Sequence, residues 1–375
     1  MTAPLRIVAT CPPGLAELLA EELRALGALA VAPGAGRVAF RGHRRVLHRV
    51  HLEAGLASQV RVLVGRVEAR RLGALEDAVR ELPWAAHLRP GVPRRPRVEV
   101  RAWRIRHSGA IAERALAASA ARLEDGLAEA DPDGVTVMVR GHRDVFALSI
   151  DTAGAPLHRR GYRLDGAKAP LREDLALALL EVSGWTADLP LLDPLSGAGT
   201  ILIEAARRAR GIAPGRDRTF DLARTAHHHE PTWTRVLDEA RARERPSTGA
   251  PIVGADRVRG ALEATRANAE RAGVRTDLTL EHAALSSLVA PQLAGRPAGA
   301  VVTNPPYGRR TGDRRTLERL YGALVRRTAS LGPAWTLTLV LPRQRRPAPL
   351  RQLRSVLATL HGGVPVRYLS SPRPG

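Results

Sequence analysis

The sequence of 375 residues contains one cysteine, one lysine and no apolar run long enough to cross a bilayer. A single cysteine, Cys11, excludes an intrachain disulfide and a cysteine-rich zinc site. The sequence also lacks a charged segment followed by an apolar leader, which predicts a soluble cytoplasmic protein with no membrane partner. Because Lys168 is the only lysine, almost all of the positive charge is carried by arginine.

Basic residues greatly outnumber acidic ones. The formal net charge is +21, which suits a polyanionic partner such as nucleic acid or an acidic membrane surface. A compositional bias explains arginine in place of lysine, but it does not explain the excess over 37 acidic residues. The arginines also cluster, and their planar forks suit phosphate. We therefore predict contacts with nucleic acid, and the residues assigned to them are Arg101, Arg104, Arg106, Arg159, Arg160, Arg163, Arg309 and Arg310.

The chain is longer than one compact domain usually is, so two or three domains are expected. Residues 5–9 and 37–40 have the pattern of short strands, and leucines recur at helical spacing between residues 15 and 26. This order indicates a small α+β unit. The α/β pattern continues from residue 45 to residue 150, where strands at 135–139 and 145–150 form a hairpin.

A buried strand over residues 189–192 is followed by a glycine-rich turn and a helix over residues 201–210. This order presents backbone N–H groups and a helix N-terminus to a ligand. Three common loops do not fit it. A P-loop requires a lysine here, a dinucleotide fingerprint requires glycine or alanine where Leu202 stands, and a nucleophile elbow requires glycines on both sides of Ser196. The next strand, over residues 251–254, leads to Asp256, whose carboxylate can accept hydrogen bonds from both hydroxyls of a ribose.

The segment Asn304-Pro305-Pro306-Tyr307 directly follows an apolar strand over residues 297–302. The asparagine side-chain oxygen and the carbonyl of Pro305 are two hydrogen-bond acceptors, and the prolines hold the backbone extended. The tyrosine offers a flat face on which a base can stack. The segment therefore predicts a site at the end of a strand that binds an exocyclic amino group.

Asn304-Pro305-Pro306-Tyr307 resembles the catalytic motif of class I S-adenosylmethionine-dependent methyltransferases that act on amino nitrogens, and residues 193–206 resemble their cofactor loop. Residues 11–23, 107–113, 148–154 and 155–163 resemble the N-terminal part of RNA methyltransferases that contain a THUMP domain. The resemblance implies an α/β protein: a ferredoxin-like segment at 1–44, an RNA-binding THUMP domain at 45–155 and a Rossmann-like class I methyltransferase domain at 156–375.

The resemblance also implies roles for individual residues. It gives catalytic roles to Asn304, Pro305, Pro306 and Tyr307. S-adenosylmethionine is expected to contact Asp193, Pro194, Ser196, Gly197, Gly199, Thr200, Asp256, Glu281 and His282.

Two features depart from that pattern or invite another interpretation. Family members usually place an aspartate after the third strand to bind the adenine amino group, whereas Glu281 and His282 stand here, and one of them is expected to take its place. The adjacent histidines at 227–229 suggest a metal, but histidines in a polar loop are more often solvated, and we expect no metal.

The resemblance implies that a monomer transfers a methyl group to the exocyclic N2 of a guanine in structured RNA, either 23S rRNA or tRNA. The Asn-Pro-Pro-Tyr grip fits the N6 of adenine equally well, and only the THUMP resemblance favours guanine. Methylation of a protein glutamine would leave the arginine clusters without phosphates. An alternative of another class is a non-catalytic RNA-binding or chaperone protein whose cofactor pocket has degenerated at Glu281 and His282.

Overall fold

The computed structural model describes residues 3–101, 105, 107–164, 171–307, 314–344 and 347–372. The chain forms two compact units, one of Met1–Cys11, Ala20–Leu157 and Arg218–Leu237, the other of Pro12–Leu19, His158–Asp217 and Asp238–Gly375. Residues 218–237 therefore belong to the N-terminal unit, although they interrupt the C-terminal unit in sequence. Within the described ranges no helix has both the length and the apolar character needed to cross a membrane.

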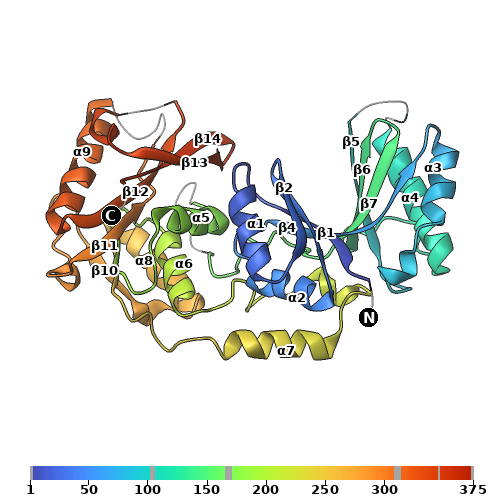
Figure 1. Ribbon diagram of the computed structural model, residues 1–375, viewed down its shortest axis with the longest axis horizontal. Coiled ribbons are helices and arrows are strands. Elements are labelled where there is room, and N and C mark those ends of the chain that lie inside the picture. Colours follow the sequence, from blue (N-terminus) through green and yellow to red (C-terminus); the bar gives the residue numbers. More distant parts are fainter. Residues whose placement is uncertain are drawn as a thin grey trace. The chain divides into compact units, whose positions relative to one another are not determined.

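The first unit is built on a seven-stranded sheet of order β2-β3-β1-β4-β7-β6-β5 (Figure 1). Strands β5 and β6 pair in parallel and the other neighbours are antiparallel. The strands are β1 (Leu5–Thr10), β2 (Leu29–Gly34), β3 (Arg37–Gly42), β4 (Gln59–Glu68), β5 (Arg94–Arg101), β6 (Val135–His142) and β7 (Val145–Asp151). The helices wholly in this unit are α2 (Arg44–Glu53), α3 (Leu72–Arg80), α4 (Ser108–Leu123), η1 (Trp84–Ala86) and η2 (Asp221–Arg224). Helices α1 (Ala16–Ala25) and α7 (Glu230–Arg241) each have residues in both units.

Strand β4 joins the two parts of this sheet. It pairs with β1 from Ile7↔Val62 to Thr10↔Gln59, and it pairs with β7 from Arg61↔Asp151 to Glu68↔Val145. The sheet is therefore continuous across the expected boundary between a ferredoxin-like segment and a THUMP domain at residues 44 and 45. That boundary stays a prediction, whereas the expected hairpin of β6 and β7 is confirmed.

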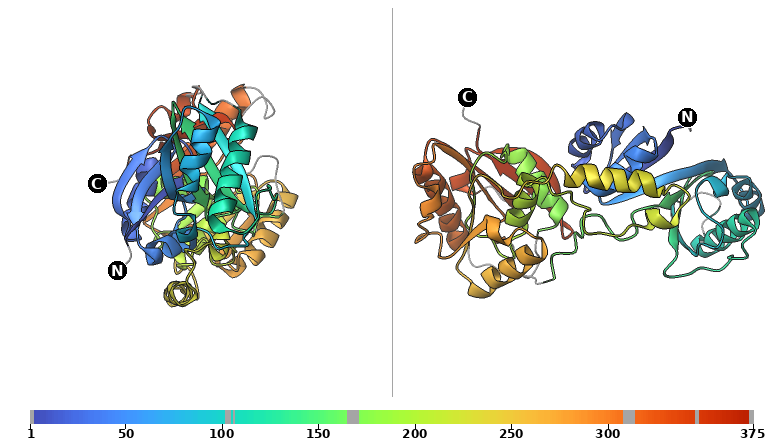
Figure 2. Two further views of the ribbon diagram at one scale, coloured as in Figure 1. Left: turned by 90° about the vertical axis from the view of Figure 1, so that its right-hand side faces the viewer. Right: turned by 90° about the horizontal axis from the view of Figure 1, so that it is seen from below.

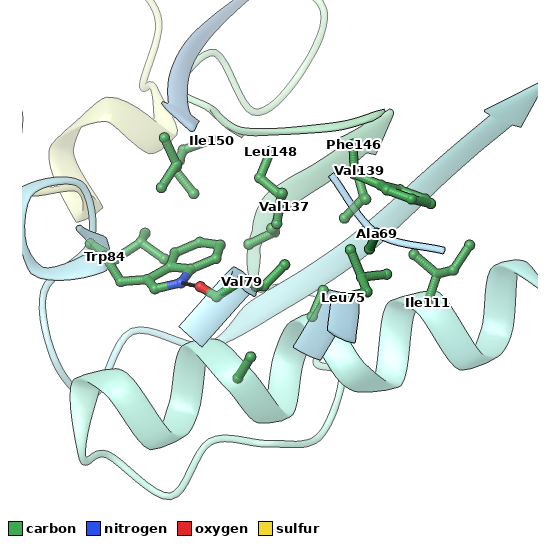
Figure 3. Packing of buried hydrophobic residues seen from close by; sticks show 14 of the residues in the cluster. Ala69, Leu75, Val79, Trp84, Ile111, Val137, Val139, Phe146, Leu148 and Ile150 are labelled. Atoms are coloured by element: carbon green, nitrogen blue, oxygen red, sulfur yellow. Dashed lines mark hydrogen bonds between the residues drawn. The ribbon is translucent and has the colours of Figure 1, made fainter. Parts of the chain in front are cut away.

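The outer part of the first unit has a well-defined apolar core. Helices α3 and α4 lie side by side on one face of the sheet (Figures 1 and 2). Cross-strand pairing puts Val137 opposite Ile150 and Val139 opposite Leu148, so these side chains share the face that the helices cover. Figure 3 shows them packed with Trp84, which is fully buried and whose indole N–H donates to the Val79 carbonyl at 2.8 Å. This hydrogen bond satisfies the one polar group of the buried indole.

The second unit has a seven-stranded sheet of order β10-β9-β8-β11-β12-β14-β13. Its strands are β8 (Leu191–Asp193), β9 (Ile252–Asp256), β10 (Leu278–His282), β11 (Ala298–Thr303), β12 (Ala334–Pro342), β13 (Arg354–His361) and β14 (Val364–Ser370). The helices are α5 (Glu173–Ser183), α6 (Thr200–Ala209), α8 (Arg259–Arg271), α9 (Arg314–Leu331), η3 (Arg275–Asp277), η4 (Pro291–Leu293) and η5 (Ala348–Leu350). Strands β8 to β12 are parallel to one another, and β14 and β13 extend the sheet beyond β12 as an antiparallel hairpin.

Helices cover both faces of this second sheet. On one face Leu317 and Tyr321 of α9 pack against strand residues such as Val301. On the other face α6 lies so close to β9 that a Cβ on Gly254 would stand 2.2 Å from Leu202. This three-layer arrangement confirms the expected α/β, Rossmann-like fold. Strands β8, β9 and β10 are added in one direction from β8 and β11 and β12 in the other, so the strand order reverses between the parallel strands β8 and β11. In such sheets ligands bind in the crevice at that point, at the carboxyl ends of the strands.

Candidate functional site

Asp193 ties together the two loops that flank this crevice. It ends β8, is 1% exposed, and its Oδ1 accepts a hydrogen bond from the Thr303 hydroxyl at 2.7 Å and from the Leu195 backbone N–H at 3.2 Å. Thr303 is the last residue of β11, directly before Asn304. Burial raises the pKa of Asp193 to about 7, and the hydrogen bond from Thr303 acts against that rise. Asp193, expected to contact a cofactor, therefore holds the ends of two neighbouring strands in register.

The glycine-rich loop is held open by α8. Gly197 and Gly199 have φ angles of +54° and +81°, which glycine adopts readily. The Thr265 hydroxyl donates to the Gly197 carbonyl at 2.8 Å, and the Asn268 amide donates to the Ala198 carbonyl at 3.1 Å. A Cβ on Gly197 would meet nothing within 4 Å. The loop therefore has a fixed backbone with free space beside Gly197.

The carboxylate of Asp256 is bound to the same loop. Its Oδ2 accepts from the Gly197 N–H at 3.0 Å and its Oδ1 from the Val258 N–H at 2.9 Å. His282, which pairs with Asp256 across β9 and β10, is exposed, and its Nε2 lies 3.1 Å from the Arg257 carbonyl. Asp256 retains the lone pairs to accept further hydrogen bonds at the strand end.

Three buried side-chain oxygens near the carboxyl ends of β8, β10 and β11 have no hydrogen-bond partner in the described part of the chain. They are Oγ of Ser196, Oε1 of Glu281 and Oδ1 of Asn304. The other oxygen of Glu281 accepts from the Ala290 N–H at 3.3 Å, so this side chain turns into the fold while His282 turns outward. An unsatisfied buried oxygen costs about 1–3 kcal/mol, so three at the same edge of one sheet indicate acceptors that a polar ligand would satisfy.

The motif after β11 leaves the sheet without regular structure. Pro305 is buried, Pro306 is exposed and Tyr307 is half-buried. The Tyr307 hydroxyl donates to Nδ1 of His361, at the end of β13, and the two rings meet edge to face with centroids 6.2 Å apart. Burial raises the pKa of Tyr307 to about 12, so the hydroxyl keeps its proton. Sequence reasoning missed His361, because nothing in the sequence links it to a motif more than fifty residues earlier.

The structure separates the predicted nucleic-acid arginines into different groups. Arg101 and Arg159 are exposed. Arg163 is partly buried, and it lies 3.5 Å from Glu173 and donates to the Leu171 carbonyl. Arg160 is 2% exposed and lies 3.9 Å from Glu204, so the structure corrects its assignment to phosphate. The residues that lie outside the described ranges are Arg104, Arg106, Arg309 and Arg310.

Of the histidines at 227–229, His229 is exposed as expected, whereas His227 is buried. His227 is 4% exposed, and its Nε2 lies 3.0 Å from Nδ1 of His87, which is also buried. Burial lowers the pKa of His87 to about 4 and that of His227 to about 3, so both are neutral at pH 7. Among the described residues no group of three or more His, Cys, Asp or Glu side chains is arranged to hold a metal ion. The contact between His87 and His227 packs the insertion 218–237 against the rest of the first unit.

Comparison with known proteins places this geometry in a family. Residues 160–354 match the family described as RMKL-like, methyltransferase domain, and residues 6–63 match the RlmL ferredoxin-like domain. The ribosomal RNA large subunit methyltransferase K/L of Syntrophotalea carbinolica is 37% identical over 337 residues, which cover 86% of this chain and 47% of that protein. The slr0064 protein of Synechocystis sp., named as a candidate RNA methyltransferase, is 31% identical over 319 residues, which cover 84% of this chain and 82% of that protein.

A solved structure matches over the whole chain. SMU.472, named as a candidate methyltransferase and solved as a complex with SAH, superposes with a TM-score of 0.87 at 25% identity and full coverage of both chains. The chain spans about half the length of the K/L methyltransferases that it matches. The match over residues 160–354, with the glycine-rich loop and the Asn-Pro-Pro-Tyr motif at the strand ends, shows that the chain belongs to the family of RMKL-like methyltransferase domains.

Proposed function

We propose that this chain transfers the methyl group of S-adenosylmethionine to the exocyclic N2 of a guanine in structured RNA. The observation that carries the proposal is Oδ1 of Asn304, a buried acceptor without a hydrogen-bond partner in the described residues, at the end of β11 beside the reversal of the sheet. An acceptor held in this way, next to the carbonyl of Pro305, suits the two N–H bonds of an amino group.

The residues of the second unit fit S-adenosylmethionine, which supplies an electrophilic methyl group when bound. Asp256 would accept hydrogen bonds from the ribose hydroxyls, and the free space beside Gly197 admits a ligand close to the backbone. The unpartnered oxygens of Ser196 and Glu281 would accept from ligand N–H or O–H groups. SMU.472, which shares this fold at 25% identity, holds SAH.

The protein's own part in the reaction is orientation and charge stabilisation. Asn304 Oδ1 and the Pro305 carbonyl would accept the two N–H bonds of the guanine amine, which directs its lone pair at the methyl carbon. The amine nitrogen would gain positive charge as it takes the methyl group from the sulfonium, which leaves as a neutral thioether, and the two acceptors would stabilise that charge. The extra proton leaves to water afterwards, so no strong base is required. Tyr307, fixed through its hydroxyl to His361, would stack on a base flipped out of its helix.

The proposal that RNA is the substrate rests on the net charge of the chain and on the names of the similar proteins. The net charge of +21 suits a polyanion, and the relatives are named for ribosomal RNA of the large subunit or for RNA. We infer that large-subunit rRNA in the cytoplasm is the substrate, in preference to tRNA. Arg101 and Arg159 are the predicted phosphate ligands that the structure leaves exposed.

The test is transfer of labelled methyl from S-adenosylmethionine to RNA from a strain that lacks this gene, with nucleosides identified by mass spectrometry. Label in N2-methylguanosine of large-subunit rRNA is expected. Label in N6-methyladenosine would keep the site and overturn the base, and RNA binding without label would support a non-catalytic protein. Asn304→Ala should lower the rate about 10²- to 10³-fold, as loss of one preorganised group does, with cofactor affinity unchanged. A near-normal rate in this variant contradicts the assigned role.

A further inference from the structure

The first unit contains a pocket that the methyltransferase site does not use. It has a volume of about 200 Å³ and is formed within the insertion 218–237. Side chains that line it include Arg218, Thr219, Phe220, His228, Glu230 and Trp233. Pockets for drug-sized ligands usually have about 300–1,000 Å³, so this one suits a single flat ring rather than a nucleotide cofactor.

Aromatic rings form its walls in a fixed arrangement. Phe220 and Trp233 meet edge to face with centroids 5.8 Å apart. The ring of His48 on α2 has its centroid 5.9 Å from that of Trp233 and 5.6 Å from that of His228. Trp233 is half-buried, so part of the indole remains accessible. A base could therefore stack on a ring that its neighbours already hold in place.

A cation is built into the same wall. The guanidinium of Arg218 lies 5.4 Å from the centre of the Phe220 ring, a cation–π contact. Its two terminal nitrogens donate to the carbonyls of Pro156 and Ala155, at 2.9 and 2.8 Å. Arg218 therefore holds a guanidinium in a fixed place beside the pocket.

The surrounding charge is also positive. The charge of Arg44 lowers the pKa values of His48 and His227. The charges of Arg224 and Arg95 likewise act to lower the pKa of Asp221, against the larger effect of its burial. Burial lowers the pKa of His48 to about 4, so this histidine is neutral at pH 7. Arginines near the segment include Arg44, Arg95, Arg218 and Arg224, and the acidic side chains near it include Asp151, Asp221 and Glu230.

Glu230 gives the pocket a means to read a base edge. Its carboxylate is largely exposed, and Oε2 lies 2.8 Å from Nε2 of His228. A carboxylate accepts hydrogen bonds from the amino groups of bases, as it does from cytosine N4. Stacking walls, a positive field and an edge acceptor together are the elements by which proteins capture unpaired bases of RNA.

We propose that this pocket binds one unpaired base of the RNA substrate and so anchors the RNA on the first unit. The inference rests on the proposed RNA substrate, but not on methyl transfer itself. The pocket is lined by residues of the insertion 218–237, which belongs to the first unit although it interrupts the methyltransferase domain in sequence.

The test measures binding of the full chain to an unmodified transcript of large-subunit rRNA, in the absence of methyl donor. Trp233→Ala should raise the dissociation constant about 5- to 150-fold, the range expected for one base–aromatic stack, and Trp233→Phe should largely restore it. Because Trp233→Ala also removes packing from His48, Thr219→Glu is the second variant. It places a negative charge at an exposed lining position and should weaken binding without loss of the core.

His229→Ala is the matched control, because His229 is exposed and adjacent but does not line the pocket. It should leave the dissociation constant unchanged. With a transcript that carries thiouridine, irradiation should crosslink RNA to the peptide that contains residues 218–233. Unchanged affinity in both Trp233→Ala and Thr219→Glu, or crosslinks confined to other peptides, would overturn the proposal and leave a protein ligand as the alternative occupant. Tight RNA binding that depends on the pocket but without methyl transfer would overturn only the proposed function.

Discussion

Replacement of Thr303 by valine should weaken the second unit by an amount that depends on pH. Valine keeps the shape of threonine but removes the hydroxyl that donates to the buried carboxyl of Asp193 at 2.7 Å. The remaining donor to that oxygen, the Leu195 N–H at 3.2 Å, is longer. The variant therefore leaves a buried carboxyl short of a hydrogen bond without creating a cavity.

The magnitude follows from the charge on Asp193. Because burial raises its pKa to about 7, the unfolded chain ionises first as the pH rises, and the contribution of this group to stability is complete below about pH 4 and is lost between about pH 4 and 7. At pH 8 the hydroxyl bonds a carboxylate, worth about 1.5–3 kcal/mol, whereas at pH 5 it bonds a neutral carboxyl, worth about 0.5–1.5 kcal/mol. We expect Thr303→Val to cost about 1 kcal/mol more at pH 8 than at pH 5.

The assay is urea-induced unfolding at both pH values, followed by hydrogen exchange of peptides that contain β8 and β11, so that the second unit is measured by itself. Thr303→Ser retains the hydroxyl and is the control. An equal loss of unfolding free energy at pH 5 and pH 8, or the same loss in Thr303→Ser, would refute the reasoning about Asp193.

Two further predictions concern hydrogen bonds found only in the structure. Tyr307→Phe and His361→Ala should each slow methyl transfer, because each removes the hydrogen bond between the two side chains. The double variant should be no slower than the slower single variant, which corresponds to a coupling energy of about 0.5–1.5 kcal/mol. Additive losses in this double-mutant cycle would show that His361 does not act through Tyr307. For His87 and His227, whose pKa values burial lowers to about 4 and 3, the unfolded chain binds protons first, so the free energy of unfolding should fall below about pH 6.5 by roughly 1.4 kcal/mol per pH unit for each. His227→Gln should show a shallower fall in urea unfolding between pH 7 and pH 5, and an unchanged slope would contradict the assignment.

The sequence predicts the parts of the site that are local in the chain. An apolar run followed by a glycine-rich or proline-rich loop identifies a strand end and its ligand loop, so the segments around Gly197 and Asn304 could be assigned before the structure. Because β8 and β11 are adjacent and parallel, at the point where the strand order reverses, those two loops meet at one crevice. The hydrophobic periodicity and the turn residues are sufficient to assign these two loops, because each pattern lies within a few residues of the chain.

Partners that are distant in the chain could not be predicted in this way. Arginine is a common phosphate ligand, but Arg160 is buried beside Glu204, so its guanidinium faces a carboxylate of the protein. His227 lies in a run of polar residues, yet it is buried against His87 from a distant segment. Thr303 and His361 likewise owe their roles to partners from other strands. In each case the chemistry depends on strand order and helix packing, which composition and periodicity do not specify.

The shared strand β4 has a mechanical consequence. Main-chain hydrogen bonds join it to β1 on one edge and to β7 on the other, so a load applied to either part of the first sheet passes through strands under shear rather than through a flexible tether. The sheet of the first unit should therefore move as one rigid body. A truncation that removes residues 1–44 would strip β1 from β4 and leave an open strand edge, which invites aggregation.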